Sequence, residues 1–191
     1  MTHYKTKFVT LTLILTSLPL LLLPNAHAAQ TPTKIPGLII AKGKLSQDHK
    51  TTKLGYNLSK AIPMGGAHHP GWATCMAYTT PVAAEYAIHS MEHGAVWIAY
   101  DKSLKSSEIS ALTAYTKNDP FLLLTPVVKA PNPITVTAWG FQLKLEKASD
   151  PRIKTFIKTY QNSKTTPELG APCQSGISDP IFLTKPQPLK K

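Results

Sequence analysis

The sequence predicts one small domain of the α/β or α+β class, in which about three helices pack against a mixed sheet. Three stretches combine good helix formers or apolar residues at helical spacing, and apolar runs of strand length separate them. The elements follow in the order helix, strand, helix, strand, strand, helix, which is typical of a small sheet covered by helices. The chain without its first 28 residues has about 160 residues, enough for one core.

The first helix is predicted over residues 82–93. Thr80 offers an N-cap and Pro81 suits the first helical position, while Gly94 suits the C-terminal end. Residues 95–100 alternate and carry large apolar and aromatic side chains, which favours a buried strand.

A second helix is predicted from Ser106 or Ser107, either of which could serve as N-cap, to about Lys117. The apolar residues 121–128 that follow have the length of a strand. Because Pro126 has no N–H to give to a neighbouring strand, we expect an edge strand or a bulge there.

Apolar and polar residues alternate in residues 134–147, and Gly140 marks a bend among them. This pattern predicts either one long bent strand or a pair of strands. Asp150 and Pro151 then repeat the combination of cap and proline. The apolar residues of the following stretch recur at helical spacing and predict a third helix; they are Ile153, Phe156, Ile157 and Tyr160.

Residues 1–28 have the pattern of a cleavable secretory signal peptide. Lys5 and Lys7 precede an apolar run from Phe8 to Leu23, and the small residues of an A-x-A cleavage site follow. The run falls short of the roughly 20 residues that span a bilayer. We therefore expect cleavage after Ala28 and a secreted or periplasmic protein, with an uncleaved N-terminal membrane anchor as the alternative.

The rest of the chain divides by composition into three parts. Residues 29–60 are rich in polar residues and glycine and predict an extended lead-in, with one edge strand at the apolar cluster 38–40. Residues 61–175 form the ordered domain. Residues 176–191 predict a loose C-terminal tail.

The net charge is +11, and it falls to +9 once Lys5 and Lys7 are removed with the signal peptide. Such a chain is weakly attracted to anionic surfaces. The lysines are scattered and Arg152 is the sole arginine. The sequence therefore has no cluster of arginines, the side chain that binds phosphate through two hydrogen bonds at once. Specific nucleic-acid binding is therefore not expected.

The motif H-x-x-E-H at His89–His93 is the main chemical signal of the chain, because in inverzincins two such histidines bind zinc and the glutamate acts as general base. Helical geometry places His89, Glu92, His93 and Glu85 on one side, opposite the apolar residues. We expect this polar side to face away from the core. The alternative is an ordinary solvated helix face.

A second histidine pair, His68 and His69, follows two glycines and precedes a proline, so a sharply bent loop could bring an imidazole to the helix. The alternative is a polar turn. Imidazoles with a carboxylate suit zinc or copper. Met64 and Met91 could add sulfur for copper, although Met91 lies on the apolar side of the helix.

Cys75 and Cys173 are the two cysteines of the chain. In an oxidising compartment the default is one disulfide between them. The competing interpretation is that Cys75, which lies close to His68 and His69 in sequence, is a metal-binding thiolate.

Several motifs taken together resemble the bacterial family of unknown function DUF3105. The resemblance spans residues 64–173, and the stretches that carry it are Gly65–His68, Trp72–Tyr78, His89–Ile98, Thr137–Gly140 and Thr166–Cys173. The family's S-G-P-H block appears as Gly-Gly-Ala-His, with His68 as the family histidine, and its H-S-L-E-H-G block has Met91 in the leucine's place. The resemblance implies an exported or membrane-tethered bacterial protein, and it places the histidines and Glu92 in the family pattern.

Three functions remain open. The first is an exported zinc- or copper-binding protein with His68, His89, His93 and Glu92 as ligands, and with His69, Cys75 and Glu85 as possible additions. The second is a metal-free structural or interaction module of the cell envelope with a partner not identified by the sequence. The third is a zinc hydrolase with Glu92 as catalytic base. A hydrolase needs a third ligand, and we interpret the downstream position of Glu168, in a Pro/Gly-rich loop, as coincidence.

Overall fold

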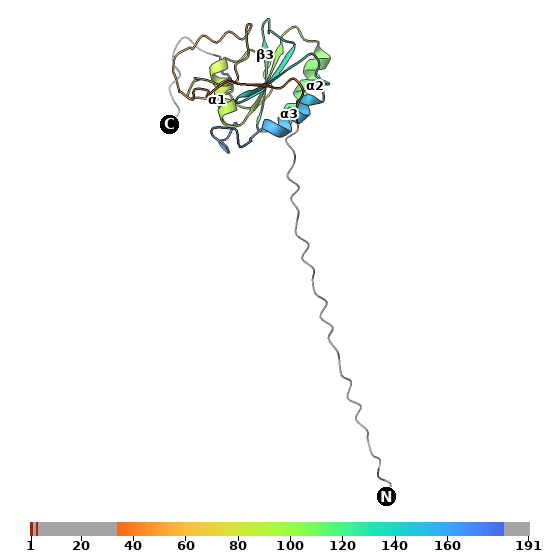
Figure 1. Cartoon of the computed structure of the whole chain (residues 1–191). Helices are drawn as coiled ribbons and strands as arrows, with labels where there is room; N and C mark the ends of the chain where they lie inside the picture. Colours follow the sequence, from red (N-terminus) through yellow and green to blue (C-terminus); the bar gives the residue numbers. More distant parts are fainter. Residues whose placement is uncertain (2, 4–33, 182–191) are drawn as a thin grey trace. The chain divides into compact units, whose positions relative to one another are not determined.

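A five-stranded mixed sheet forms the centre of the domain (Figure 1). The computed structural model describes residues 1, 3 and 34–181, so the predicted signal peptide lies almost entirely outside the described residues. The elements of the described part, in chain order, are β1 (Ile39–Ile40), α1 (Ala84–Glu92), β2 (Val96–Asp101), α2 (Ser106–Thr116), β3 (Leu122–Val127), β4 (Ile134–Ala138), β5 (Phe141–Leu145) and α3 (Arg152–Tyr160). The predicted fold class is confirmed, as α+β.

The strand order is β1-β5-β4-β2-β3, with β2 and β3 parallel and the other pairs antiparallel. Helix α2 connects the two parallel strands, as a parallel pair requires. Strand β3 lies at one edge of the sheet, and the Leu124 amide donates outward to the Met76 carbonyl. Pro126 lies two residues further along the strand, so an N–H at that position would also point outward. The proline therefore costs no hydrogen bond to β2, and the expectation of an edge strand is confirmed.

The stretch 134–147 forms a hairpin, so of the two alternatives for it the pair of strands is correct. Strands β4 and β5 are joined by a two-residue turn, Trp139 and Gly140, in which Gly140 has a φ of +81°. Glycine adopts this conformation without the steric cost that a side chain would bring. The Gly140 amide donates to the Met64 carbonyl, which fastens the loop before His68 to the tip of the hairpin.

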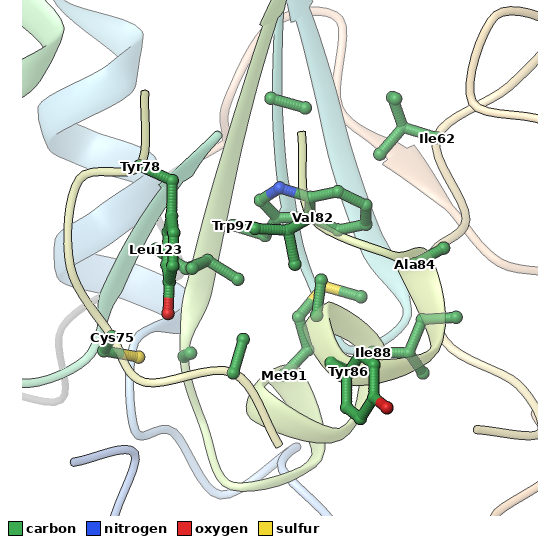
Figure 2. Packing of buried hydrophobic residues seen from close by; sticks show 14 of the residues in the cluster. Ile62, Cys75, Tyr78, Val82, Ala84, Tyr86, Ile88, Met91, Trp97 and Leu123 are labelled. Atoms are coloured by element: carbon green, nitrogen blue, oxygen red, sulfur yellow. The ribbon is translucent and has the colours of Figure 1, made fainter. Parts of the chain in front are cut away.

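Helix α1 covers one face of the sheet, and α2 with α3 covers the other (Figure 1). Strand β2 shows the alternation, because Trp97 packs with α1 whereas Val96 and Ile98 pack with α2 and α3. Met91 of α1 lies in the same cluster as Trp97 (Figure 2). Met91 is therefore part of the core.

All three helix starts differ in detail from the prediction. Helix α1 begins after Ala83 and α2 after Lys105, and neither residue makes a side-chain cap, so neither Thr80 nor a serine acts as N-cap. Before α3 the Asp150 carboxylate does accept the Arg152 amide, although Pro151 occupies the N-cap position. Gly94 ends α1 with a φ of +101°, as expected.

Every residue of α1 is buried, including its polar side. The prediction that this side faces away from the core is correct only in the sense that it faces away from the sheet; it does not face water. Segments before and after the central domain lie over it, and Leu54 for example donates its amide to Glu85 Oε1 at 2.8 Å. The solvated-face alternative is therefore wrong.

The two ends of the described domain are attached to it. The Ile177 amide donates to the Trp72 carbonyl and the Ala83 amide to the Pro180 carbonyl, so the start of the predicted loose tail is hydrogen-bonded to the domain, whereas residues 182–191 lie outside the described residues. Within residues 1, 3 and 34–181 no helix has the length and apolar character needed to cross a membrane.

Candidate metal centre

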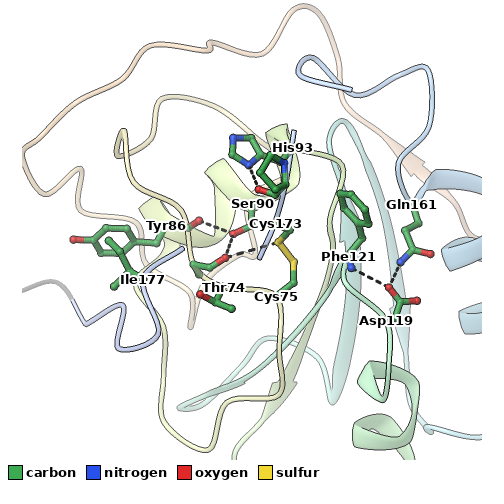
Figure 3. The surroundings of a disulfide bond; sticks show 12 residues. Thr74, Cys75, Tyr86, Ser90, His93, Asp119, Phe121, Gln161, Cys173 and Ile177 are labelled. Atoms are coloured by element: carbon green, nitrogen blue, oxygen red, sulfur yellow. Dashed lines mark hydrogen bonds between the residues drawn. A yellow bond between two sulfur atoms is a disulfide. The ribbon is translucent and has the colours of Figure 1, made fainter. Parts of the chain in front are cut away.

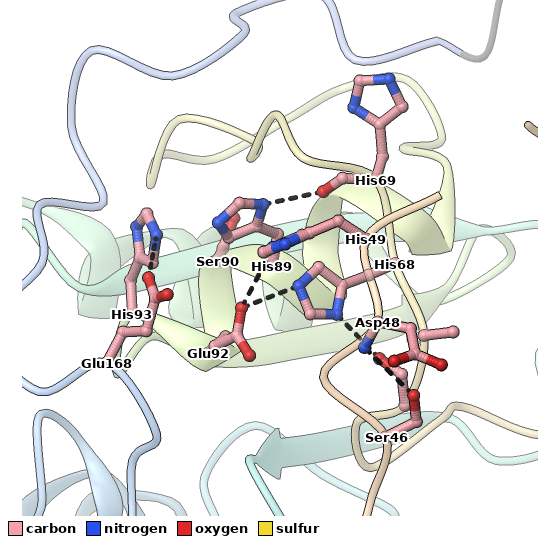
Figure 4. A network of polar contacts seen from close by, with 12 residues as sticks. Ser46, Asp48, His49, His68, His69, His89, Ser90, Glu92, His93 and Glu168 are labelled. Atoms are coloured by element: carbon pink, nitrogen blue, oxygen red, sulfur yellow. Dashed lines mark hydrogen bonds and ion pairs between the residues drawn. The ribbon is translucent and has the colours of Figure 1, made fainter. Parts of the chain in front are cut away.

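Four separate parts of the chain bring the candidate side chains together, the last of which is the loop that carries Glu168 (Figure 4). Helix α1 contributes His89, Glu92 and His93, whose spacing places them on one side of the helix. The loop before it contributes His68. The lead-in contributes His49, which forms a parallel bridge with His68, because the Lys50 amide donates to the His68 carbonyl and the His68 amide to the Asp48 carbonyl.

The loop that carries His68 depends on its two glycines. Gly65 and Gly66 have φ values of +134° and +120°, and a Cβ on Gly65 would lie 2.8 Å from Leu45 and 3.1 Å from the Trp139 ring. The Tyr56 hydroxyl donates to the Ala67 carbonyl at 2.7 Å and holds the next residue. The prediction of a sharply bent loop that brings an imidazole to the helix is thus confirmed for His68.

The first cluster, called here the inner group, consists of His49, His68, His89 and Glu92. One ligand atom from each lies within 4.8 Å of the others. Glu92 Oε2 is 2.8 Å from His68 Nε2 and 3.5 Å from His49 Nε2. His49 is 42% exposed at its side chain, whereas the other three residues are buried. The inner group therefore opens to solvent at His49.

The second cluster, called here the outer group, consists of His89, His93 and Glu168, again with ligand atoms within 4.8 Å of one another. Glu168 Oε2 is 3.2 Å from His93 Nε2, and its side chain is 48% exposed. Glu168 therefore lies beside His89 and His93, although its downstream position was interpreted as a coincidence of spacing. The predicted ligand set is divided, with His68 and Glu92 in one group, His93 in the other and His89 in both.

Each of the three buried histidines of the two groups donates Nδ1–H to a backbone carbonyl. The acceptors are Gly66 for His68, His69 for His89 and Pro172 for His93, at 2.8, 2.7 and 2.8 Å. A carbonyl oxygen only accepts, so Nδ1 carries the proton and Nε2 presents its lone pair in the neutral ring. Metal-ligating histidines are oriented by the same kind of outer hydrogen bond.

This orientation makes the contact between His68 and Glu92 informative. With Nδ1 already donating, Nε2 of a neutral His68 would face the carboxylate oxygen lone pair to lone pair at 2.8 Å. Attraction to an ionised carboxylate there requires either a second proton on the ring or a metal ion. Burial raises the pKa of Glu92, but the hydrogen bond from His68 and the nearby imidazoles outweigh it, so the pKa is lowered and the carboxylate is ionised.

The neighbouring His89 is neutral at pH 7. Burial lowers its pKa to about 4 despite the hydrogen bond to the His69 carbonyl, and the nearby imidazoles lower it further. A neutral imidazole is the form that binds a metal ion. The centre thus contains at least one histidine ready to bind, beside an ionised carboxylate.

Two of the possible additional ligands, His69 and Glu85, lie outside both groups. The His69 ring points away from the cluster in Figure 4, and its Nδ1 accepts the Gly71 amide. Glu85 accepts the Leu54 amide instead and so holds the covering segment in place. Its role here is positional.

Cys75 is paired with Cys173 in a disulfide (Figure 3). The expected pairing is therefore present, and the competing interpretation of Cys75 as a metal thiolate is contradicted because its sulfur is already bonded. Cys173 follows Pro172 in sequence, and the Pro172 carbonyl accepts a hydrogen bond from His93 Nδ1. The disulfide therefore anchors the loop that carries Glu168 next to α1.

His49 is the functional residue that sequence reasoning missed. It lies in a polar segment without apolar periodicity, interpreted as a lead-in, and no residue close to it in sequence marks it as a ligand. The available signal was its side-chain type, since it is the remaining histidine after the first 28 residues once the two pairs are set aside.

A family model described as a protein of unknown function, DUF3105, matches residues 49–175. The chain belongs to the DUF3105 family. The match begins at His49 and ends just after Cys173, so every member of the inner and outer groups lies inside the DUF3105 region. Comparisons with curated proteins and with solved structures gave no match.

Proposed function

We propose that this DUF3105 protein is exported and binds one transition-metal ion, zinc or copper, at the inner group. The observation that carries the proposal is the arrangement of His68 and Glu92. Two buried groups that would otherwise meet lone pair to lone pair lie 2.8 Å apart, and the imidazole is held by a carbonyl in the orientation of a metal ligand. An ion among the four ligand atoms supplies the positive charge.

The donor set limits the metal to a small class. Up to three imidazoles and one carboxylate form a tetrahedral set that suits zinc, and the same donors suit copper(II). A copper(I) site would favour sulfur, but Met91 is packed in the core against Trp97 and Cys75 is in the disulfide. Zinc and copper(II) are therefore the ions to test.

Export rests on two observations. The signal pattern of residues 1–28 has the three regions of a secretory leader in the right order. The disulfide between Cys75 and Cys173 belongs to an oxidising compartment such as the periplasm or the cell exterior. The two are independent, since one depends on the leader and the other on the folded domain.

Glu92 fits the role of a ligand better than that of a general base. Its Oε2 faces His68 and His49 at distances that a shared ion would bridge, which leaves no separate carboxylate in the inner group to take a proton from bound water. A hydrolase is accordingly not proposed.

The second candidate is a metal-free envelope module in which the same residues form a structural cluster. It is favoured by one observation, the ability of a doubly protonated His68 to pair with Glu92 at 2.8 Å without any ion. The two candidates predict different responses to metal and can be separated directly.

The deciding experiment is metal analysis of the purified protein, followed by thermal unfolding after chelation with and without zinc or copper(II). The variant is the double substitution His68→Gln with Glu92→Gln. The matched control is His69→Gln, which changes the adjacent histidine outside both groups. Near-stoichiometric metal in wild type and control, bound much more weakly in the double variant, supports the proposal. No bound metal and no change in unfolding temperature with either ion supports the metal-free module.

A further inference from the structure

The outer group has features that the proposed single ion does not use. His93 is 4% exposed, and its Nδ1 is fixed by the Pro172 carbonyl, so its Nε2 is aimed at Glu168 with the same orientation that His68 has toward Glu92. A second pair of imidazole and carboxylate thus repeats the arrangement of the inner group on the same helix.

Glu168 is held in this position by its backbone. Its amide donates to the Glu92 carbonyl at the end of α1, and its own carbonyl accepts the Ala171 amide. Cys173 then fixes the end of the loop through the disulfide. Although the Glu168 side chain is half exposed, its loop is tied to Glu92 of α1 at one end and to Cys75 at the other. The contact with His93 is built into the fold.

His89 belongs to both groups, but it can serve only one ion at a time. Its Nδ1 donates to the His69 carbonyl at 2.7 Å, which leaves a single lone pair at Nε2. A neutral imidazole with one free lone pair binds one metal ion. Two ions in the two groups would therefore compete for His89.

We propose that His89, His93 and Glu168 form a second metal position, and that the two positions share the Nε2 lone pair of His89. This inference rests on the proposed function and adds a second position to it. The ligand at both positions is a divalent ion of the zinc and copper class, because each position combines imidazole nitrogen with one carboxylate.

The shared ligand determines how the positions fill. The first ion takes the inner group with all four donors. A second ion at the outer group must draw His89 away or bind with His93 and Glu168 alone, so the second step is weaker than the first. Loss of His89 weakens the first step and leaves the second nearly unchanged, because the second ion gains nothing net from a ligand that the first ion already holds. Loss of Glu168 weakens the second step alone. Loss of the inner group frees His89 for the outer group, which then binds more tightly than in the second step of wild type.

The test is a calorimetric titration of the full chain, freed of metal by chelation, with zinc alone. The variants are Glu168→Gln for the outer group, His89→Gln for the shared ligand, and the double variant His68→Gln with Glu92→Gln for the inner group. The matched control is Glu146→Gln, an exposed glutamate outside both groups. Because Glu168 is half exposed, its variant is expected to fold, and thermal unfolding without metal verifies this.

We expect two binding steps in wild type and in the control. Glu168→Gln should weaken the second step at least tenfold and leave the first within about threefold. His89→Gln should weaken the first step at least tenfold and leave the second within about threefold. His68→Gln with Glu92→Gln should leave one step, tighter than the second step of wild type, because His89 is then free for the outer group.

A single step in wild type, two steps unchanged by Glu168→Gln, or a remaining step in the inner-group variant that is no tighter than the second step of wild type each overturns the shared second position. Any of these leaves the proposed function standing. If wild type binds neither zinc nor, in a repeat titration, copper(II), both proposals are overturned.

Discussion

The buried contact between His68 and Glu92 makes a sharp prediction for the protein without metal. His68 is fully buried and Glu92 is 1% exposed, and their nearest atoms are 2.8 Å apart. In Glu92→Leu a buried imidazole loses its partner, and removing one member of a buried pair costs about 3–5 kcal/mol. In Glu92→Gln the amide N–H can donate to the Nε2 lone pair of a neutral His68, so one hydrogen bond replaces the charged pair.

The cost of Glu92→Gln should therefore be about 1–2 kcal/mol, well below that of leucine. For a domain of this size 1 kcal/mol shifts the unfolding temperature by about 2–4 °C, so leucine should lower it by about 10 °C and glutamine by a few degrees. The assay is urea and thermal unfolding in chelator, followed by tryptophan fluorescence. Equal losses for leucine and glutamine, or no loss for leucine, would refute the assignment of Nδ1 and Nε2 on which the metal proposal depends.

Three further predictions concern pH, the disulfide and the end of α1. The His89 pKa of about 4 lies below the ordinary 6.5, so its neutral form contributes stability that is complete above pH 6.5 and lost as the pH falls toward 4. Unfolding in chelator across this range should show a loss on the order of 3 kcal/mol that is absent in His89→Gln. The disulfide spans a sequence separation of 98 residues, and its reduction should cost about 4 kcal/mol, read as a lower urea midpoint with reductant; an unchanged midpoint would contradict this. Gly94→Ala places a Cβ 3.0 Å from the Asn162 backbone at a φ of +101° and should cost on the order of 2 kcal/mol, whereas Gly43→Ala, with no atom within 4 Å, should cost about 1 kcal/mol in the same assay. Equal losses would show that the contact with Asn162 is unimportant.

Local sequence patterns determined most of the secondary structure. Helix α1 was predicted within two residues at each end, because a proline precedes it and a glycine follows it, and both act on the backbone near them in sequence. Pro126 indicated an edge strand for the same reason, since the loss of an N–H is a property of the residue itself. The helix caps were predicted less well, because the segments packed against a helix start also decide where it begins.

The H-x-x-E-H motif was enough to identify His89, Glu92 and His93 as neighbours, because helical spacing alone brings them to one side. The family pattern and the glycine pair indicated that His68 would join them. The three motif residues depend on short-range geometry, because they lie within five consecutive residues, whereas His68 reaches Glu92 across 24 residues of sequence.

The remaining parts were decided by tertiary structure alone. His49 and Glu168 reach α1 from opposite ends of the domain, one through a bridge to His68 and the other through a loop anchored beside the disulfide. No local pattern encodes contacts between residues so far apart in sequence, because they form only when the sheet and its helices are in place. The same packing buries the polar side of α1, and so brings its side chains into two groups of candidate ligands that both contain His89.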